Sequence, residues 1–178
     1  KEETRTISGK IKATMSVNAT SLMLKRRQST NRFVVTGLAK GDYISSWTSS
    51  NKKIVTVSGR SNGTCTIKAG NKTGKAKITI TLASGLKKVI NVTVQKKAVT
   101  CAAIKNVSKK LTLNRKKSYQ LKPVISPITC TSKAKYKTSN KKVVKVTSKG
   151  KITAVKKGKA KITVMVGKKK FVCTVTIK

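Results

Sequence analysis

Residues 158–164 read Gly158-Lys159-Ala160-Lys161-Ile162-Thr163-Val164, and this stretch decides how the rest of the chain is interpreted. Apolar side chains at 160, 162 and 164 alternate with lysine or threonine at 159, 161 and 163. Successive side chains of a β-strand point to opposite faces. The alternation therefore predicts a strand with one apolar face and one face that carries lysine.

The same pattern occurs earlier in the chain, as Gly74-Lys75-Ala76-Lys77-Ile78-Thr79-Ile80. Two further segments repeat in the same order. Ser50-Asn51-Lys52-Lys53-Ile54-Val55-Thr56-Val57 returns as Ser139-Asn140-Lys141-Lys142-Val143-Val144-Lys145-Val146, and Val89–Val94 returns as Val172–Ile177. Asn140 follows Asn51 by 89 residues, whereas Ile177 follows Val94 by 83, so the offset drifts only by loop-sized insertions. Three ordered matches predict a duplicated structural unit.

The repeat predicts two domains, residues 1–95 and 96–178, with residues 1–12 as a tail or linker. No Pro-rich or Gly-rich linker separates them, which favours a semi-rigid junction. Turn signals such as Ser-Asn-Lys-Lys, Lys149-Gly150 and Lys157-Gly158 punctuate each unit at short intervals. Aromatic residues make up only 3% of the chain, so the cores must be built from Val, Ile, Leu and Ala. The expected fold is all-β, two tandem immunoglobulin-like sandwiches of roughly seven short strands each.

The charge of the chain is extreme, with 43 Lys and Arg against 3 Asp and Glu and a net charge of +40. Such a surface attracts polyanions. Equally, lysines on strands block edge-to-edge pairing and keep a β-protein soluble, so the charge alone names no ligand. The candidate polyanion-binding residues lie in the predicted turns: Lys116, Lys117, Lys141, Lys142, Lys156, Lys157, Lys168, Lys169 and Lys170. Lysine acts as a point charge and base-edge readout favours Arg, Asn and Gln, so specific nucleic-acid recognition is not expected.

Catalysis and metal binding are poorly supported by the composition. The chain has no histidine, and its acidic residues are Glu2, Glu3 and Asp42. General acid–base chemistry and calcium sites both need carboxylates in suitable positions, so we expect no enzyme activity, no cofactor and no metal site. No stretch approaches the roughly 20 apolar residues of a membrane span. The chain begins without Met, which favours a fragment or a processed chain.

Four cysteines are present, none in a Cys-x-x-Cys motif. Cys65 and Cys173 fall at apolar positions of predicted strands, Cys65 where the second repeat has Ile152, and are interpreted as small core residues. Cys101 and Cys130 fall at the beginning of the first strand and after the second strand of the second domain. A Cys101–Cys130 disulfide, a Cys130–Cys173 disulfide and three reduced thiols are all compatible with these positions.

The repeated segments and the residues next to them resemble a known family. Trp47-Thr48-Ser49-Ser50-Asn51 followed by Ile54-Val55-Thr56-Val57, and Gly150-Lys151-Ile152-Thr153-Ala154 followed by residues 158–164, are similar to the conserved core of group 2 bacterial immunoglobulin-like domains. The resemblance covers nearly all of the second domain and about two-thirds of the first. It implies an extracellular setting, on a bacterial cell surface or secreted, and says little about a ligand.

Trp47 and Tyr136 occupy equivalent positions, where sandwiches commonly bury an aromatic, and are interpreted as core anchors rather than sugar-stacking residues. Three functions stay open. The first is a non-catalytic surface module that acts as a spacer or adhesive region beside other domains of its parent protein. The second is a lysine-rich module that retains the protein on anionic cell-wall polymer or host surface glycan. The third is an accessory region of a secreted enzyme.

Overall fold

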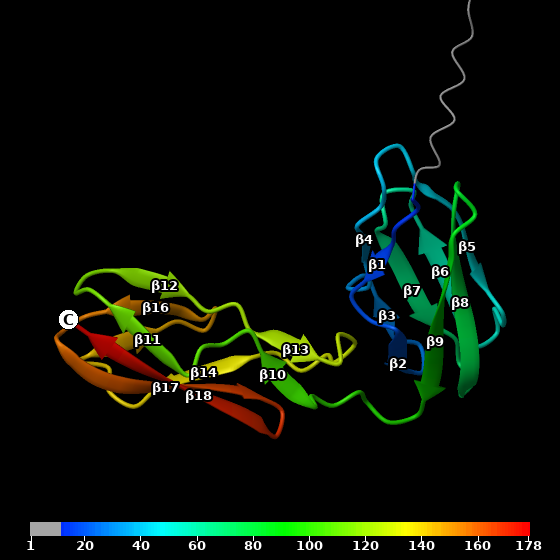
Figure 1. Ribbon diagram of the computed structural model, residues 1–178. Helices are drawn as coiled ribbons and strands as arrows, with labels where there is room; N and C mark the ends of the chain where they lie inside the picture. The colour runs from blue at the N-terminus through cyan, green and yellow to red at the C-terminus, as the bar shows by residue number, and fades with distance from the viewer. Residues whose placement is uncertain (1–11) are drawn as a thin grey trace, which may run out of the picture. The chain divides into compact units, whose positions relative to one another are not determined.

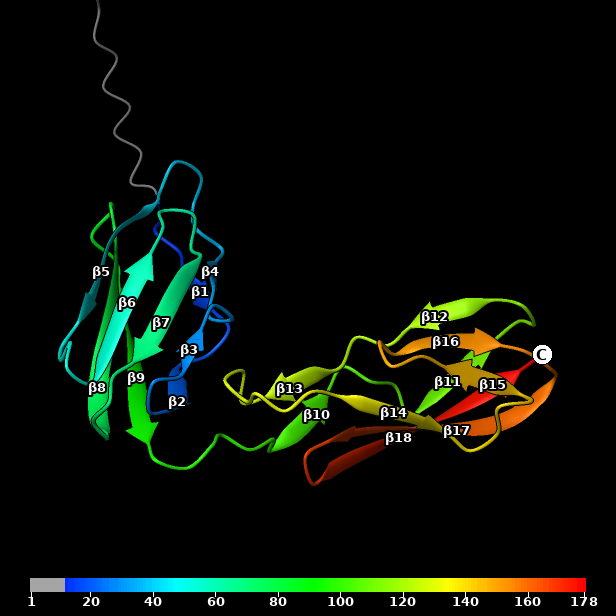
Figure 2. The ribbon, with the colours of Figure 1, turned by 180° about the vertical axis from the view of Figure 1, so that it is seen from behind.

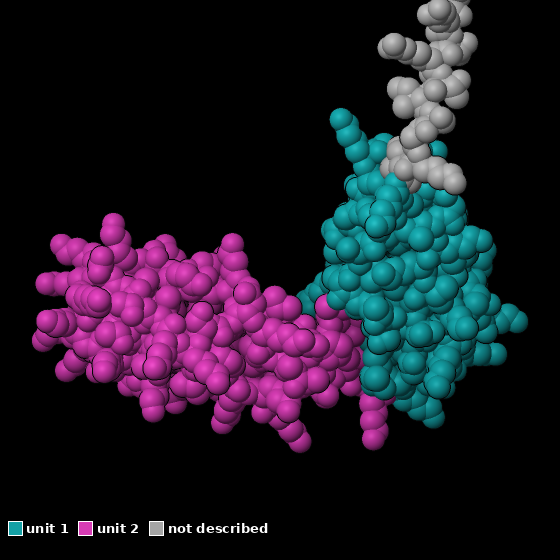
Figure 3. Space-filling view, in the orientation of Figure 1, with its two compact units in different colours: residues 1–96 teal, residues 97–178 magenta. Residues whose placement is uncertain are grey.

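The computed structural model describes residues 12–178 and divides the chain into two compact units, residues 1–96 and 97–178 (Figure 3). The described residues form β-strands joined by turns and loops, and none of them lies in a helix (Figures 1 and 2). The predicted all-β fold is confirmed. The predicted tail, residues 1–12, lies outside the described residues except for Lys12.

Unit 1 is a sandwich of two main sheets. A four-stranded sheet has the order β2-β9-β8-β5, in which β2 pairs parallel with β9, and a three-stranded sheet has the order β3-β7-β6. The short strands β1 and β4 pair beside them. The strands are β1 (Ser16–Val17), β2 (Ser21–Lys25), β3 (Ser29–Thr30), β4 (Val35–Thr36), β5 (Ile44–Ser49), β6 (Val55–Gly59), β7 (Cys65–Ala69), β8 (Gly74–Leu82) and β9 (Lys87–Gln95).

Unit 2 repeats this topology. Its sheets have the orders β11-β18-β17-β14 and β12-β16-β15, and β10 pairs with β13. The parallel pairing of β11 with β18 corresponds to that of β2 with β9. The strands are β10 (Ala103–Lys105), β11 (Lys110–Leu113), β12 (Ser118–Gln120), β13 (Val124–Ser126), β14 (Lys135–Thr138), β15 (Val144–Val146), β16 (Lys151–Ala154), β17 (Gly158–Val166) and β18 (Lys169–Ile177).

The alternation in the sequence builds the cores. On β17 the side chains of Ala160, Ile162, Val164 and Val166 are buried, whereas Lys159 and Lys161 are exposed. On β8 the same division separates the buried residues Ala76, Ile78, Ile80 and Leu82 from the exposed residues Lys75 and Lys77. Each long strand therefore lays one apolar face on the opposing sheet and leaves the lysine face outside.

The repeated Ser-Asn-Lys-Lys segment forms the same hydrogen-bonded turn in both units. The Asn51 side chain accepts a hydrogen bond from the Lys53 amide at 3.0 Å, and Asn140 does the same for Lys142 at 2.9 Å. These side chains close the turn after β5 and after β14, a local role that suits asparagine. The hydroxyl of the preceding serine, Ser50 or Ser139, accepts a hydrogen bond from a backbone amide of the neighbouring long strand, β8 or β17.

One predicted equivalence between the repeats is wrong. In β6 and β15, Val57 pairs with Ile67 and Val146 pairs with Ile152, so Ile67 and not Cys65 occupies the position of Ile152. Cys65 lies two residue pairs further along the hairpin and faces Gly59. The β6–β7 hairpin is longer than its counterpart, and Cys65 still points inward because the shift of two residues preserves the face.

Candidate polyanion-binding surfaces

Six of the nine predicted turn lysines gather at one end of unit 2. Lys116 and Lys117 follow β11, Lys141 and Lys142 follow β14, and Lys156 and Lys157 follow β16. Backbone hydrogen bonds tie the three turns together: the Lys116 amide donates to the Ala154 carbonyl at 3.0 Å, and the Val155 amide donates to Val143 at 2.9 Å. We call this set of six lysines the C-terminal pole, because Lys178 lies beside it and accepts from Arg115 at 3.2 Å (Figure 1).

The other three predicted lysines are at the opposite end of unit 2. Lys168, Lys169 and Lys170 belong to the hairpin between β17 and β18, where Lys169 pairs with Val166. The C-terminal pole lies at the other end of these strands, where Gly158 pairs with Ile177. Because nine-residue strands separate the two ends, by about 30 Å, the nine lysines do not form one patch.

A third set of lysines lies on the outer face of the β11-β18-β17-β14 sheet. Its members are exposed, and the strand registers place them on one face with the threonines 112, 163, 174 and 176 between them: Lys110, Lys135, Lys137, Lys159, Lys161 and Lys170. We call this set the sheet-face lysines. Of these six, only Lys170 is among the turn lysines predicted from the sequence, because the cross-strand register that gathers the others cannot be read from one strand.

The register keeps these like charges from lying directly opposite each other. Lys159 faces Thr176, Lys161 faces Thr174, and Lys137 faces Thr163. Lys110 also faces Thr174, while Lys135 and Lys170 flank Met165. Like charges placed directly opposite destabilise a sheet, so this arrangement lets one face carry six lysines. Residues 97–178 contain no aspartate or glutamate that would neutralise them.

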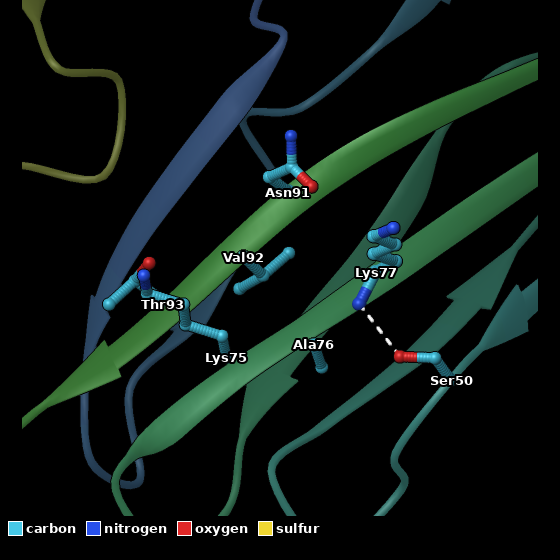
Figure 4. Close-up of a pocket in the computed structure, with 7 residues that line it drawn as sticks. All are labelled: Ser50, Lys75, Ala76, Lys77, Asn91, Val92 and Thr93. Atoms are coloured by element: carbon cyan, nitrogen blue, oxygen red, sulfur yellow. Dashed lines mark hydrogen bonds between the residues drawn. The ribbon is translucent and has the colours of Figure 1, made fainter.

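On unit 1 the equivalent face holds a pocket of about 430 Å³ between β8 and β9 (Figure 4). Lys75 and Lys77 come from β8, Asn91 and Thr93 from β9, and Ser50 from the loop after β5. Ser50 is held in place by two bonds to β8: its hydroxyl accepts from the Lys77 amide at 2.9 Å, and its own amide donates to the Lys77 carbonyl at 2.9 Å.

The two aromatic residues interpreted as anchors are half-buried in the structure. Trp47, on the edge strand β5, meets Phe33 edge to face with ring centroids 6.3 Å apart, and its indole N–H donates to the Arg60 carbonyl at 3.3 Å. Tyr136, on the edge strand β14, packs against the core of unit 2, and burial raises the pKa of its hydroxyl. Both rings turn inward, away from the lysine face, since they pair with the buried residues Ile80 and Val164.

All four cysteines are buried thiols in the structure. Cys101 and Cys130 pack together with Val166 in a small cluster, and burial together with the neighbouring Cys130 raises the pKa of Cys101. Cys173 belongs to the main core instead, opposite Ile162. The structure thus brings Cys101 and Cys130 together but leaves their bridge a prediction. Cys65 is buried, its thiol contacts the Phe33 carbonyl at 3.6 Å, and burial raises its pKa to about 11.

Asp42 is the one acidic side chain among the described residues, and it closes a loop. Its carboxylate accepts from the Ser84 hydroxyl at 2.6 Å and from the amides of Tyr43 and Ser84 at 2.9 and 3.2 Å. The hydrogen bond from the Ser84 side chain is the main reason that the pKa of Asp42 lies below its usual value, so the group stays ionised to a lower pH than an ordinary aspartate. A carboxylate held in this state is a poor general acid.

Within residues 12–178 no group of His, Cys, Asp and Glu is arranged to hold a metal ion. No helix in the described part of the chain is long and apolar enough to cross a membrane.

Comparison with known proteins identifies both units. The sequence profile of the bacterial Ig-like domain (group 2) matches residues 11–98 and again residues 98–177. Among solved structures, domains 5–6 of the S-layer protein SbsC are 19% identical, with 93% of this chain and 97% of that chain aligned at a TM-score of 0.47. The C-terminal 282-residue fragment of intimin, in complex with the intimin-binding domain of the translocated intimin receptor, is 16% identical over 93% of this chain and 64% of that chain at a TM-score of 0.35.

A termite-gut GH10 xylanase that contains a bacterial Ig-like domain is 22% identical over 38% of this chain, with a TM-score of 0.32, and the aligned part spans 18% of the xylanase chain. No curated protein sequence matches the chain.

Proposed function

From the premise that the chain belongs to the group 2 bacterial Ig-like domain family over both units, we propose that it is a spacer of a bacterial surface protein. Domains of this family are generally non-catalytic accessory modules of surface proteins or enzymes. A spacer must carry the chain from one end of each domain to the other, and the path of the chain through each unit supports this role.

The chain enters and leaves each unit at opposite ends. In unit 1, residues Ala13 to Ser16 line a hollow with Leu86 at the β8–β9 hairpin, whereas Gln95 ends β9 at the far end. In unit 2, the chain enters beside the last residue of β17, because Cys101 packs on Val166. It leaves beside the first residue of β17, because Ile177, which precedes Lys178, pairs with Gly158. Each unit therefore advances the chain by about 30 Å, the length of a nine-residue strand. This path is the observation that carries the spacer proposal.

The spacer proposal is tested on the surface of a bacterium. The chain is fused between a membrane anchor and a terminal tag, and energy transfer is measured between a dye on the membrane and a dye on the tag. We expect transfer to fall when residues 1–96 are inserted and to fall again when the whole chain is inserted, because each sandwich adds its own length. Equal transfer from all three fusions would contradict the proposal.

A second function is supported by the charge distribution. The C-terminal pole, the sheet-face lysines and the hairpin at Lys168–Lys170 give unit 2 cationic surfaces on several sides, and residues 97–178 contain no acidic side chain. In this function the lysines hold the parent protein on the anionic polymers of a cell wall or on a host surface glycan. Such binding is sequence-blind and weakens steeply as salt is added, because it depends on released counterions.

A further inference from the structure

The two units present the same arrangement of side chains on equivalent faces. In unit 1 the pocket is lined by Ser50, Lys75, Lys77, Asn91 and Thr93. In unit 2 the corresponding positions follow from the strand registers, because Lys161 faces Thr174 and Lys159 faces Thr176, as Lys77 faces Asn91 and Lys75 faces Thr93. The anchoring serine is repeated as well: the Ser139 hydroxyl accepts from the Lys161 amide at 2.9 Å.

Each arrangement is built on rigid parts of the fold. The lysines of each pair are two residues apart on the central strands β8 and β17, where β9 and β18 pair with them in regular register. The serine that follows each neighbouring strand, Ser50 after β5 and Ser139 after β14, is fixed by hydrogen bonds in both directions, 2.9 Å each in unit 1 and in unit 2. The exposed lysine side chains are free to reach a ligand, while their backbones and the adjacent hydroxyl groups stay in place.

The chemistry of the arrangement fits a polymer that carries an oxyanion on each short repeating unit. Two ammonium groups lie next to hydroxyl donors on each unit, and no carboxylate belongs to either face among the residues that the structure describes. The two lysines of a pair are about 7 Å apart along the strand. Phosphates joined by one short polyol unit have a spacing of the same order. The described residues of these faces include no aromatic ring that would stack on a sugar, which favours a polyol phosphate over a glycan.

We propose that these faces are two equivalent binding sites for a phosphodiester-linked polyol polymer, centred on Lys75 and Lys77 in unit 1 and on Lys159 and Lys161 in unit 2. The inference rests on the proposed polyanion binding and locates it on the sheet faces instead of the C-terminal pole. Unit 2 is the stronger site, because Lys110 and Lys137 flank its lysine pair where unit 1 has Ser21 and Thr48.

The test compares two variants that each lose four positive charges. The sheet-face variant is K75T/K77T/K159T/K161T, in which threonine retains the preference for strand. The pole variant is K117S/K141S/K142S/K156S, with substitutions confined to turns. Binding of the whole chain to a fluorescent glycerol-phosphate oligomer is measured by anisotropy across roughly 50 to 500 mM salt, and circular dichroism confirms that both variants fold.

We expect the sheet-face variant to lose at least about tenfold in affinity, and its slope of log K against log salt to fall by about one for each lysine in contact. The pole variant should lose less than about threefold. Equal losses in the two variants would overturn the sheet-face sites and leave general polyanion binding intact. No binding by the unmodified chain at the lowest salt would contradict the proposed polyanion binding itself.

A third variant keeps every charge. T93V/T176V removes one hydroxyl from each site in an almost isosteric change, and we expect a loss of about threefold, the cost of one hydrogen bond. Unchanged affinity would show that the bound phosphate does not contact these hydroxyls and would overturn the proposed arrangement. Tighter binding of a sulfated glycan than of the oligomer, at equal charge concentration, would overturn the assignment to a phosphodiester.

Discussion

Replacing Ile162 by alanine is expected to unfold unit 2 at a markedly lower temperature while unit 1 keeps its stability. Ile162 is fully buried at the centre of the unit 2 core, between β18 and β14. Removing such a side chain costs about 2–5 kcal/mol of unfolding free energy, because its contacts are lost and a cavity remains. For a domain of this size the melting temperature should fall by about 10 °C or more.

The chain contains its own reporter for this experiment. Trp47, the one tryptophan of the sequence, lies in unit 1, so tryptophan fluorescence follows the unfolding of unit 1 alone. Circular dichroism follows both units. We expect I162A to lower the midpoint of part of the dichroism signal and to leave the fluorescence midpoint unchanged. Lys161→Ala, on the adjacent outward position, should change stability by only about 0.5 kcal/mol. A parallel shift of the fluorescence midpoint would mean that the two units unfold as one body.

Gly150→Ala is expected to cost about 2–4 kcal/mol, the sum of a backbone effect and a steric effect. Gly150 has a φ of 81°, a conformation that residues with a Cβ rarely adopt. A Cβ at this position would lie 2.7 Å from Cζ of Tyr136 and 2.9 Å from its hydroxyl. The inward-facing ring of Tyr136 is therefore accommodated only because residue 150 has no side chain.

Two variants separate the two contributions. Gly167 also has a positive φ, of 57°, but a Cβ there would have no heavy atom closer than 3.8 Å. Gly167→Ala should cost only the backbone part, about 1–2 kcal/mol. Combining G150A with Tyr136→Val should cost less than the two single changes added together, because the valine leaves room for the new methyl group. Strictly additive free energies of unfolding, measured in urea, would show that the ring and residue 150 do not interact.

The fold could be predicted because the same alternation occurs twice in the sequence. Lys159 and Lys161 point outward and Ile162 inward, as the period of two requires, and Cys173 pairs with Ile162 as Ile90 pairs with Ile78. The predicted equivalence of Cys65 with Ile152 is two residues out of register, because the β6–β7 hairpin differs in length from its counterpart and both positions face the core. Hairpin length is set by turn geometry, which the apolar pattern alone does not specify.

The candidate sites were less accessible to such reasoning. Runs of adjacent lysines are easily recognised in a sequence as candidate anion-binding residues, and six of the nine predicted lysines do lie together at the C-terminal pole. That Lys168–Lys170 lie at the opposite end of unit 2 from these six lysines follows only from where β17 ends. No two of the sheet-face lysines are adjacent in the sequence, and they lie on four strands. They are brought together only by the pairing of β14 and β18 with β17 and of β11 with β18. Trp47 and Tyr136 are half-buried rather than fully buried because β5 and β14 are edge strands.

The most direct test of the polyanion account is sedimentation of the unmodified chain with purified Gram-positive cell walls. The walls are used intact and after removal of their anionic polymers, across roughly 50 to 500 mM salt. The account predicts binding that requires the polymers and collapses as salt rises. Absence of binding at the lowest salt, or equal binding to stripped walls, would contradict it and leave the lysines as charge that keeps a passive spacer soluble.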